Sequence, residues 1–153
     1  MIRSAVLEDS EAIAKVLLES RRAFLPFAPS AHSDTEVRQW VRSNLIPDMR
    51  VVVWEAADTV VAVLAMSASG AESWIEQLYV LPDWNSRGIG TKLLQHAHKA
   101  LVHPIRLYTF QENAGARRFY ERNGYVATEF TDGQGNEEKC PDVLYVYAGS
   151  TEA

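Results

Sequence analysis

The chain has 153 residues, of which 47% are hydrophobic and 23% are charged, and its Asp and Glu residues outnumber its Lys and Arg residues by 20 to 15. This length and composition predict one soluble globular domain over residues 1–153, and they exclude a multi-domain enzyme and a low-complexity chain. The net charge of −5 offers no overall attraction for nucleic acid or for anionic lipid headgroups.

The N-terminal third predicts a short strand and two helices. Residues 2–6 are a short β candidate, and the carboxylates that follow them suit the positive end of a helix dipole. Apolar residues then recur at helical spacing as far as Phe24. Ser33 and Glu36 form a capping-box signature for the second helix, which we expect to end before Pro47.

The middle of the chain changes to a β pattern. Residues 51–54, 60–66 and 73–80 are β-rich runs separated by turns, which predicts an antiparallel meander. A helical pattern over residues 88–101 precedes a strand at 105–110, so we expect a βαβ crossover.

The last part of the chain predicts one more helix and a hairpin. Asn113 can cap the helix, and Gly124 stands where a left-handed residue is needed after its end. Residues 125–131 and 143–147 then pair across a polar turn. The predicted fold class is therefore mixed α/β, with a central, mostly antiparallel sheet of about seven strands flanked by about four helices.

The segment Asn85-Ser86-Arg87-Gly88-Ile89-Gly90-Thr91, between a strand and a helix, is the most informative part of the sequence. Its glycines let the backbone approach a ligand closely, and the free N–H groups at a helix start bind anions. A Gly-x-Gly pair also fits a plain tight turn. The dinucleotide fingerprint would need a glycine where Leu93 stands, and the Gly-Lys-Ser/Thr of the nucleoside-triphosphate loop is absent. We therefore expect a phosphate site of another kind.

Two segments resemble the GNAT superfamily of N-acetyltransferases. Residues 85–90 are similar to its Gln/Arg-x-x-Gly-x-Gly/Ala signature, with Asn85 in place of the usual Gln or Arg. Residues 113–125 resemble its Asn-x-x-Ala-x-x-Phe-Tyr-x-x-x-Gly-Phe/Tyr run. The resemblance covers roughly residues 72–130 and implies a GNAT-like fold and the use of acetyl-CoA.

The resemblance also implies positions for the cofactor. The strand before the signature would pair its backbone with the pantetheine arm, Asn113 would lie beside that arm, and Tyr120 would lie near the thioester sulfur. The strand residues are Leu78, Tyr79 and Val80, and the residues around the pyrophosphate are Ser86, Arg87, Gly88, Ile89, Gly90 and Thr91.

Acetyl transfer to an amine needs a proton acceptor and a proton donor. An alkyl amine with a pKa near ~10 is mostly protonated at neutral pH, so a carboxylate or a chain of water molecules must take its proton. Glu76, two residues before Leu78 and so expected on the same face of the strand, is the candidate base. Tyr120 is the candidate acid for the departing thiolate. Alternatively, Glu76 is a solvated strand residue and Tyr120 is part of the core.

The aromatic residues Phe24, Phe27 and Trp40 accompany a proline-bearing loop at residues 25–32. We expect them to form an apolar wall over the acceptor, and the alternative is a structural elbow between two helices. This region carries no motif that identifies the amine. A polyamine, an amino-acid derivative, an aminoglycoside and a protein N-terminus all stay open.

The expected function is transfer of the acetyl group of acetyl-CoA to a primary amine of a small molecule or peptide by direct attack. The rival from another class is an acyl-CoA-binding sensor without turnover. A homodimer is compatible with the resemblance. No metal site is expected, because His96 and His98 are two residues apart on a helix and point to different sides.

Three features predict a cytoplasmic protein without membrane contact. The longest uninterrupted apolar run, residues 60–66, is far shorter than the ~18 residues of a spanning helix. Acidic residues interrupt the N-terminus before a signal-peptide core could form. The single cysteine, Cys140, forbids an intramolecular disulfide.

Overall fold

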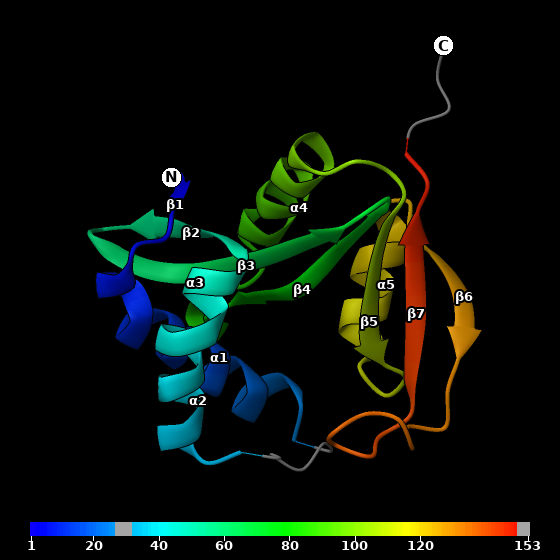
Figure 1. Ribbon diagram of the computed structural model, residues 1–153, viewed down its shortest axis with the longest axis horizontal. Helices are drawn as coiled ribbons and strands as arrows, with labels where there is room; N and C mark the ends of the chain where they lie inside the picture. Colours follow the sequence, from blue (N-terminus) through cyan, green and yellow to red (C-terminus); the bar gives the residue numbers. More distant parts are fainter. Residues whose placement is uncertain (27–31, 150–153) are drawn as a thin grey trace.

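Seven strands form one sheet in the computed structural model, which describes residues 1–26 and 32–149. The strand order is β1-β2-β3-β4-β5-β7-β6 (Figure 1). The pairing of β4 with β5 is parallel, and the other neighbours are antiparallel. The strands are β1 (Ile2–Ser4), β2 (Arg50–Ala56), β3 (Thr59–Ser69), β4 (Glu72–Val80), β5 (Ile105–Phe110), β6 (Val126–Phe130) and β7 (Asp142–Tyr147).

Helices cover both faces of the sheet (Figure 1). One face carries α1 (Ser10–Phe24) and α2 (Asp34–Trp40), which continues through a π turn (Val41–Leu45) into α3 (Ile46–Asp48). The other face carries α4 (Ile89–Ala100) and α5 (Ala114–Arg122). None of the helices within residues 1–26 and 32–149 is long and apolar enough to cross a bilayer. The mixed α/β fold with a seven-stranded sheet, predicted from the sequence, is confirmed.

Two apolar clusters hold the helices against the sheet. On the α1 face, Ile13 and Val16 pack against Val53 and Val63 of the sheet. On the α4 face, the larger cluster buries one stripe of α4 together with Tyr145 of β7. Each helix therefore buries one side only, as its apolar spacing predicts.

The capping box predicted for the second helix is confirmed. The Ser33 hydroxyl accepts a hydrogen bond from the Glu36 N–H at 3.1 Å, and the Glu36 carboxylate accepts one from the Ser33 N–H at 2.9 Å. The expectation that this helix ends before Pro47 is wrong. Helical backbone continues through Asp48, because the intervening π turn shifts the hydrogen-bond ladder at the position where Pro47 has no N–H to give.

The two halves of the sheet meet over a very short stretch. β4 pairs with β5 only at Ser73 with Ile105 and at Trp74 with Arg106, while β5 pairs with β7 along its whole length. Beyond Trp74 the strands diverge, which leaves one edge of β4 without a strand partner (Figure 1). The helix between them is α4, so the predicted βαβ crossover is confirmed.

Truncating the core side of α4 should destabilise the fold. Leu93 is 0% exposed, so Leu93→Ala should lower the free energy of unfolding by about 2–5 kcal/mol through lost burial and the cavity left behind. Val102, just beyond α4, is 72% exposed, and Val102→Ala should change that free energy by less than about 0.5 kcal/mol. Urea unfolding of both variants measures the difference, and equal losses would contradict the assignment of the core.

Candidate functional site

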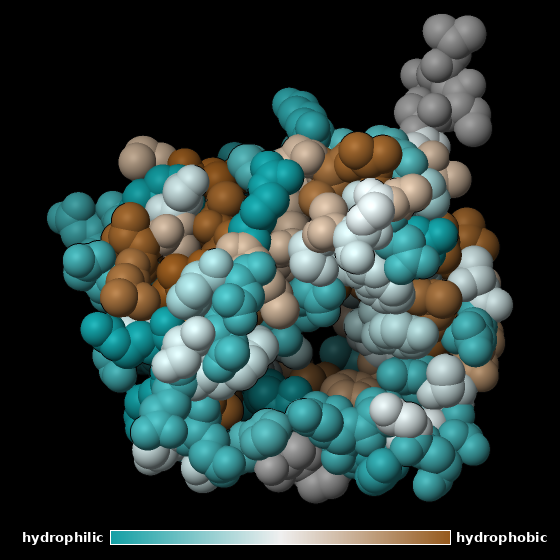
Figure 2. Space-filling view, viewed as in Figure 1, coloured by the Kyte–Doolittle hydropathy of each residue, from teal (hydrophilic) through white to brown (hydrophobic). Residues whose placement is uncertain are grey.

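The divergence of β4 from β5 opens a cavity of about 570 Å³, here called the cleft cavity. Its lining comes from α1, β4, β5, α5 and the loop between β6 and β7. A hollow near the centre of Figure 2 marks the opening between the two halves of the sheet. A second cavity of about 620 Å³, the loop cavity, borders the glycine-bearing segment before α4. The residues that line both cavities are Leu78, Tyr79, Asn113, Ala116 and Tyr120.

The glycine-bearing segment presents the start of α4 to the loop cavity. Ser86 and Gly88 have positive φ angles of 64° and 80°, and Gly88 is the N-cap residue, so no cap side chain covers the first N–H groups of the helix. Ser86, Gly88, Gly90 and Thr91 all line the cavity. A helix start open in this way binds anions through its N–H groups and dipole.

Two of the predicted phosphate-loop residues turn their side chains elsewhere. The Arg87 guanidinium lies 4.7 Å from the centre of the Trp84 ring and donates a hydrogen bond to the Asp83 carbonyl at 3.2 Å. The Ile89 side chain is buried in the core. Any contact of these two residues with a ligand in the loop cavity is therefore left to their backbone.

The free edge of β4 presents a defined set of backbone groups. The Leu81 N–H donates to the Val61 carbonyl of β3 at 2.8 Å, so by the alternation of an antiparallel pair Tyr79 also turns its backbone to β3. Leu78 and Val80 turn theirs to the opening, where the Val80 carbonyl accepts a hydrogen bond from the Ser20 hydroxyl at 3.0 Å. Of the three strand residues predicted to pair with pantetheine, Leu78 and Val80 have the required backbone direction.

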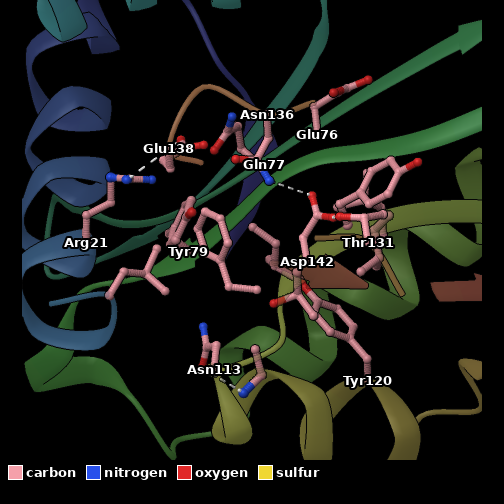
Figure 3. A pocket seen from close by; sticks show the side chains of 18 of the residues that line it. Arg21, Glu76, Gln77, Tyr79, Asn113, Tyr120, Thr131, Asn136, Glu138 and Asp142 are labelled. Atoms are coloured by element: carbon pink, nitrogen blue, oxygen red, sulfur yellow. Dashed lines mark hydrogen bonds and ion pairs between the residues drawn. The ribbon is translucent and has the colours of Figure 1, made fainter. Parts of the chain in front are cut away.

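Glu76 lies at a β-bulge. The register with β3 shifts by one residue between Gln77 and Ile75, and this bulge breaks the alternation of side chains along the strand. The Glu76 carboxylate accepts a hydrogen bond from the Ser67 hydroxyl at 2.7 Å, while Leu78 packs against the α4-side core on the opposite face. The expectation that Glu76 and Leu78 share a face is therefore wrong. Glu76 stands at the exposed rim of the cleft cavity (Figure 3).

Tyr120 lies where the cleft cavity and the loop cavity meet. It projects from α5, is 8% exposed, and burial together with the nearby Tyr79 raises the pKa of its phenol well above the ordinary value. The phenol therefore stays protonated across the physiological pH range. Asn113 also borders both cavities and fixes the start of α5, because its side-chain oxygen accepts a hydrogen bond from the Ala116 N–H at 3.1 Å.

The loop between β6 and β7, which the sequence indicated only as a polar turn, borders the cleft cavity. The Asn136 side chain donates to the Cys140 carbonyl at 2.7 Å and to the Asp142 carboxylate at 3.2 Å, and it accepts from the Cys140 N–H at 3.2 Å. Gly133 has a φ of +84°, and a Cβ there would lie 2.3 Å from the Cys140 carbonyl carbon. These contacts hold the loop in one shape.

This loop brings Glu138 to the cleft cavity. The Glu138 carboxylate lies 3.8 Å from the Arg21 guanidinium of α1, so the ion pair spans the opening from one half of the fold to the other (Figure 3). Beside them, burial raises the pKa of the Tyr79 phenol, and the charge and hydrogen bonding of Arg21 oppose that rise. Sequence reasoning missed both Arg21 and Glu138, because neither stands in a motif.

A third cavity of about 360 Å³, the side cavity, adjoins the cleft cavity. Trp40, predicted as part of the acceptor wall, lines this side cavity, whereas Phe24 lines the loop cavity. Phe27 lies outside the described residues. Tyr79 is the one residue, among those described, that borders all three cavities.

The charge around the cleft cavity differs from the charge around the loop cavity. One arginine, Arg21, and three carboxylates, those of Glu76, Glu138 and Asp142, border the cleft cavity, which suits a cationic group. The helix start at the loop cavity suits an anionic one. No group of three or more metal-ligating side chains occurs in the part of the chain that the structure describes.

Comparisons with known proteins agree with this arrangement. The sequence model of the Acetyltransferase (GNAT) family matches residues 14–125. No match was found among curated protein sequences.

Solved structures resemble the whole fold. PaiA N-acetyltransferase from Thermoplasma acidophilum, solved with coenzyme A, is 22% identical with a TM-score of 0.78, covering 97% of this chain and 98% of that one. YjaB from Escherichia coli is 24% identical with a TM-score of 0.76, covering 98% of each chain. The ribosomal-protein-S18-alanine N-acetyltransferase from Escherichia coli is 19% identical with a TM-score of 0.72, covering 100% and 96%. At these identities the likeness shows a shared fold.

The packing of Gly133 predicts a sensitive loop. Gly133→Ala places a methyl group against the Cys140 carbonyl at a positive φ, so we expect a loss of about 1–3 kcal/mol in the free energy of unfolding. Gly135→Ala is the matched control, because nothing lies within 4 Å of a Cβ at that position. Chemical unfolding measures the stabilities, and amide hydrogen exchange should show faster exchange confined to residues 131–142. An unchanged Gly133→Ala protein would contradict the close packing of this loop.

Proposed function

Because the chain belongs to the Acetyltransferase (GNAT) family, we propose that it transfers the acetyl group of acetyl-CoA to a primary amine of a small molecule or a peptide. The observation that carries the proposal is the meeting of the cleft cavity and the loop cavity at Tyr120. One cavity ends at an anion-binding helix start, the other is bordered by carboxylates, and a buried proton donor stands between them.

The residues around the loop cavity fit acetyl-CoA. The N–H groups at the start of α4 would hold the pyrophosphate, as they lie behind Gly88 with no cap side chain in the way. The backbone groups of Leu78 and Val80 that face the opening would pair with the pantetheine arm in the manner of an added strand. The thioester would then lie beside Tyr120, within reach of both cavities.

The chemistry follows from a proton inventory. An ammonium acceptor must lose one proton to become a nucleophile, and the departing thiolate must gain one. Tyr120 would donate this proton to the sulfur, because its phenol is protonated and borders both cavities. Glu76, the base predicted from the sequence, stands at the rim of the cleft cavity, and the proton leaves through a carboxylate of this cavity or through water.

The rival function is an acyl-CoA sensor without turnover. A sensor needs the loop cavity and has no use for a second, acid-bordered cavity that meets the first at a buried tyrosine. The enzyme is therefore favoured. An assay of free CoA thiol with a panel of amines separates the two, since a sensor would bind acetyl-CoA and release no thiol with any amine.

A negative charge at the start of α4 should weaken acetyl-CoA binding. Gly90 is the second residue of the helix, so Gly90→Glu would place a carboxylate beside the pyrophosphate and raise the dissociation constant about tenfold or more. Gly90→Gln adds nearly the same volume without charge, and Gln95→Glu adds the same charge on the exposed side of α4. Calorimetry on folded variants should show the largest effect in Gly90→Glu, a smaller one from bulk alone in Gly90→Gln and the smallest in Gln95→Glu. Equal affinity in all three would refute the pyrophosphate site.

Loss of the Tyr120 hydroxyl should slow the chemistry and spare binding. Tyr120→Phe keeps the ring in its packed position, so kcat should fall by a factor of about 10²–10⁴ while acetyl-CoA affinity stays nearly constant. Tyr125→Phe is the control, because Tyr125 is equally buried but its hydroxyl contacts His98 at 3.0 Å and borders neither cavity. A Tyr120→Phe enzyme with the parent kcat would show that the sulfur takes its proton from another group.

A further inference from the structure

The three carboxylates that border the cleft cavity are not equally available to an acceptor. Both oxygens of Asp142 already accept hydrogen bonds, one from the Thr131 hydroxyl and one from the Asn136 side chain. The Asp142 carbonyl also accepts a hydrogen bond from the Thr131 N–H at 3.0 Å, which joins the two ends of the β6–β7 loop. Asp142 is therefore a structural group of the loop.

Glu76 is a poor match for the reacting centre. Its carboxylate accepts a hydrogen bond from the Ser67 hydroxyl and is exposed to solvent at the rim. The bulge also turns it to the face opposite Leu78. Figure 3 shows the Glu76 side chain directed away from Tyr120.

Glu138 differs from both in its surroundings. Its side chain is 20% exposed, and it borders the side cavity as well as the cleft cavity. The 3.8 Å separation from Arg21 is an ion-pair distance longer than a hydrogen bond, so this contact does not use up the hydrogen-bonding capacity of the carboxylate. Glu138 and Tyr120 line one and the same cavity, from opposite sides of the opening (Figure 3).

The loop that carries Glu138 is built to hold it still. The Asn136 bonds described above close the loop on Cys140, and the Lys139 ammonium donates to the Gln134 carbonyl at 2.8 Å across it. Gly133 lets the two sides of the loop approach within a distance that no side chain would allow. A carboxylate needs such a fixed position if it is to accept a proton from a bound amine.

We propose that Glu138 is the carboxylate that binds the acceptor's ammonium group in the cleft cavity and takes its first proton. This inference rests on the proposed acetyltransferase function and names the base for it in place of Glu76. Glu138 would act on the amine directly or through one water molecule, which is within the reach that general-base catalysis allows.

The steps balance as follows. Glu138 accepts one proton from the ammonium group and later releases it to water, and the freed nitrogen lone pair forms a bond to the thioester carbon. The carbon–sulfur bond breaks, and the sulfur receives the proton of Tyr120. The second proton of the attacking nitrogen restores Tyr120, so the products are an amide, CoA thiol and one proton.

Other charged groups surround Glu138. Arg21 of α1 and Tyr79 of β4 lie beside it, and across the side cavity His32 contacts Glu137 at 2.9 Å and Glu36 at 3.8 Å. The contact with Glu137 raises the pKa of His32, so His32 also titrates on this side of the molecule. A pH profile must therefore be compared between variants that keep all of these groups.

The test compares the pH–rate profiles of Glu138→Gln, Glu76→Gln and the parent enzyme with the best amine from the panel. At neutral pH, Glu138→Gln should lower kcat/KM by about 10²-fold, and the deficit should shrink as the pH approaches the amine pKa near ~10. Glu138→Asp, which keeps the charge, should retain more activity than Glu138→Gln. Glu129→Gln, on the exposed strand β6, controls for a simple change in net charge.

Several outcomes would overturn the proposal. They are a Glu138→Gln profile that overlays the parent and a loss that follows Glu76→Gln instead. A rise in the acceptor KM with an unchanged pH profile would support binding of the ammonium group by Glu138 and overturn its role as the base. Acetyl-CoA affinity and thermal unfolding of each variant identify a folding defect, in which case Glu138→Asp carries the comparison. If the parent itself releases no thiol with any amine, the acetyltransferase function fails, and this result is distinct from a failure of Glu138.

Discussion

β4 and β5 share only two residue pairs, and the site exists because their hydrogen bonding stops there. An unpaired strand edge in a folded protein is normally covered or blunted, since its N–H and C=O groups must find partners. Here the edge of β4 at Leu78 and Val80 faces two cavities, apart from the Val80 carbonyl that Ser20 occupies. The same gap lets Tyr120, from the α5 side of the sheet, border a cavity that also reaches α1 on the other side.

The divergence of β4 and β5 is stable because each of them pairs with another strand along its whole length. β4 pairs with β3 from Glu72 to Val80, and β5 pairs with β7 from Ile105 to Phe110. The two halves are joined again beyond the gap by side chains, through the ion pair of Arg21 with Glu138. At 3.8 Å this ion pair is longer than a hydrogen bond, and the opening is held mainly by the strand pairing on either side of it.

Local signals predicted the parts of this molecule that depend on local chemistry. The capping box at Ser33, the cap at Asn113 and the helix start after Gly88 were all visible in the sequence, because each involves residues within a few positions of one another. The bulge at Glu76 was not, since it is a property of the register between two strands. Its effect was to reverse the expected side of the candidate base.

The loop that carries Glu138 was hidden from sequence reasoning for a similar reason. Its polar residues indicate a turn, and only the folded chain shows that Asn136 closes the turn and that Arg21, over a hundred positions earlier, meets it. The sequence likewise did not reveal the π turn before Pro47, through which the helical backbone continues to Asp48.

The loop cavity and the side cavity are lined by different structural elements. The loop cavity is formed by β4, the start of α4 and α5, whereas the side cavity is lined mainly by α1, α2 and the β6–β7 loop, with Tyr79 as their common boundary. Substitutions in the second group can accumulate during evolution without disturbing the first. A change of acceptor would thus need substitutions only outside the half proposed to hold the cofactor.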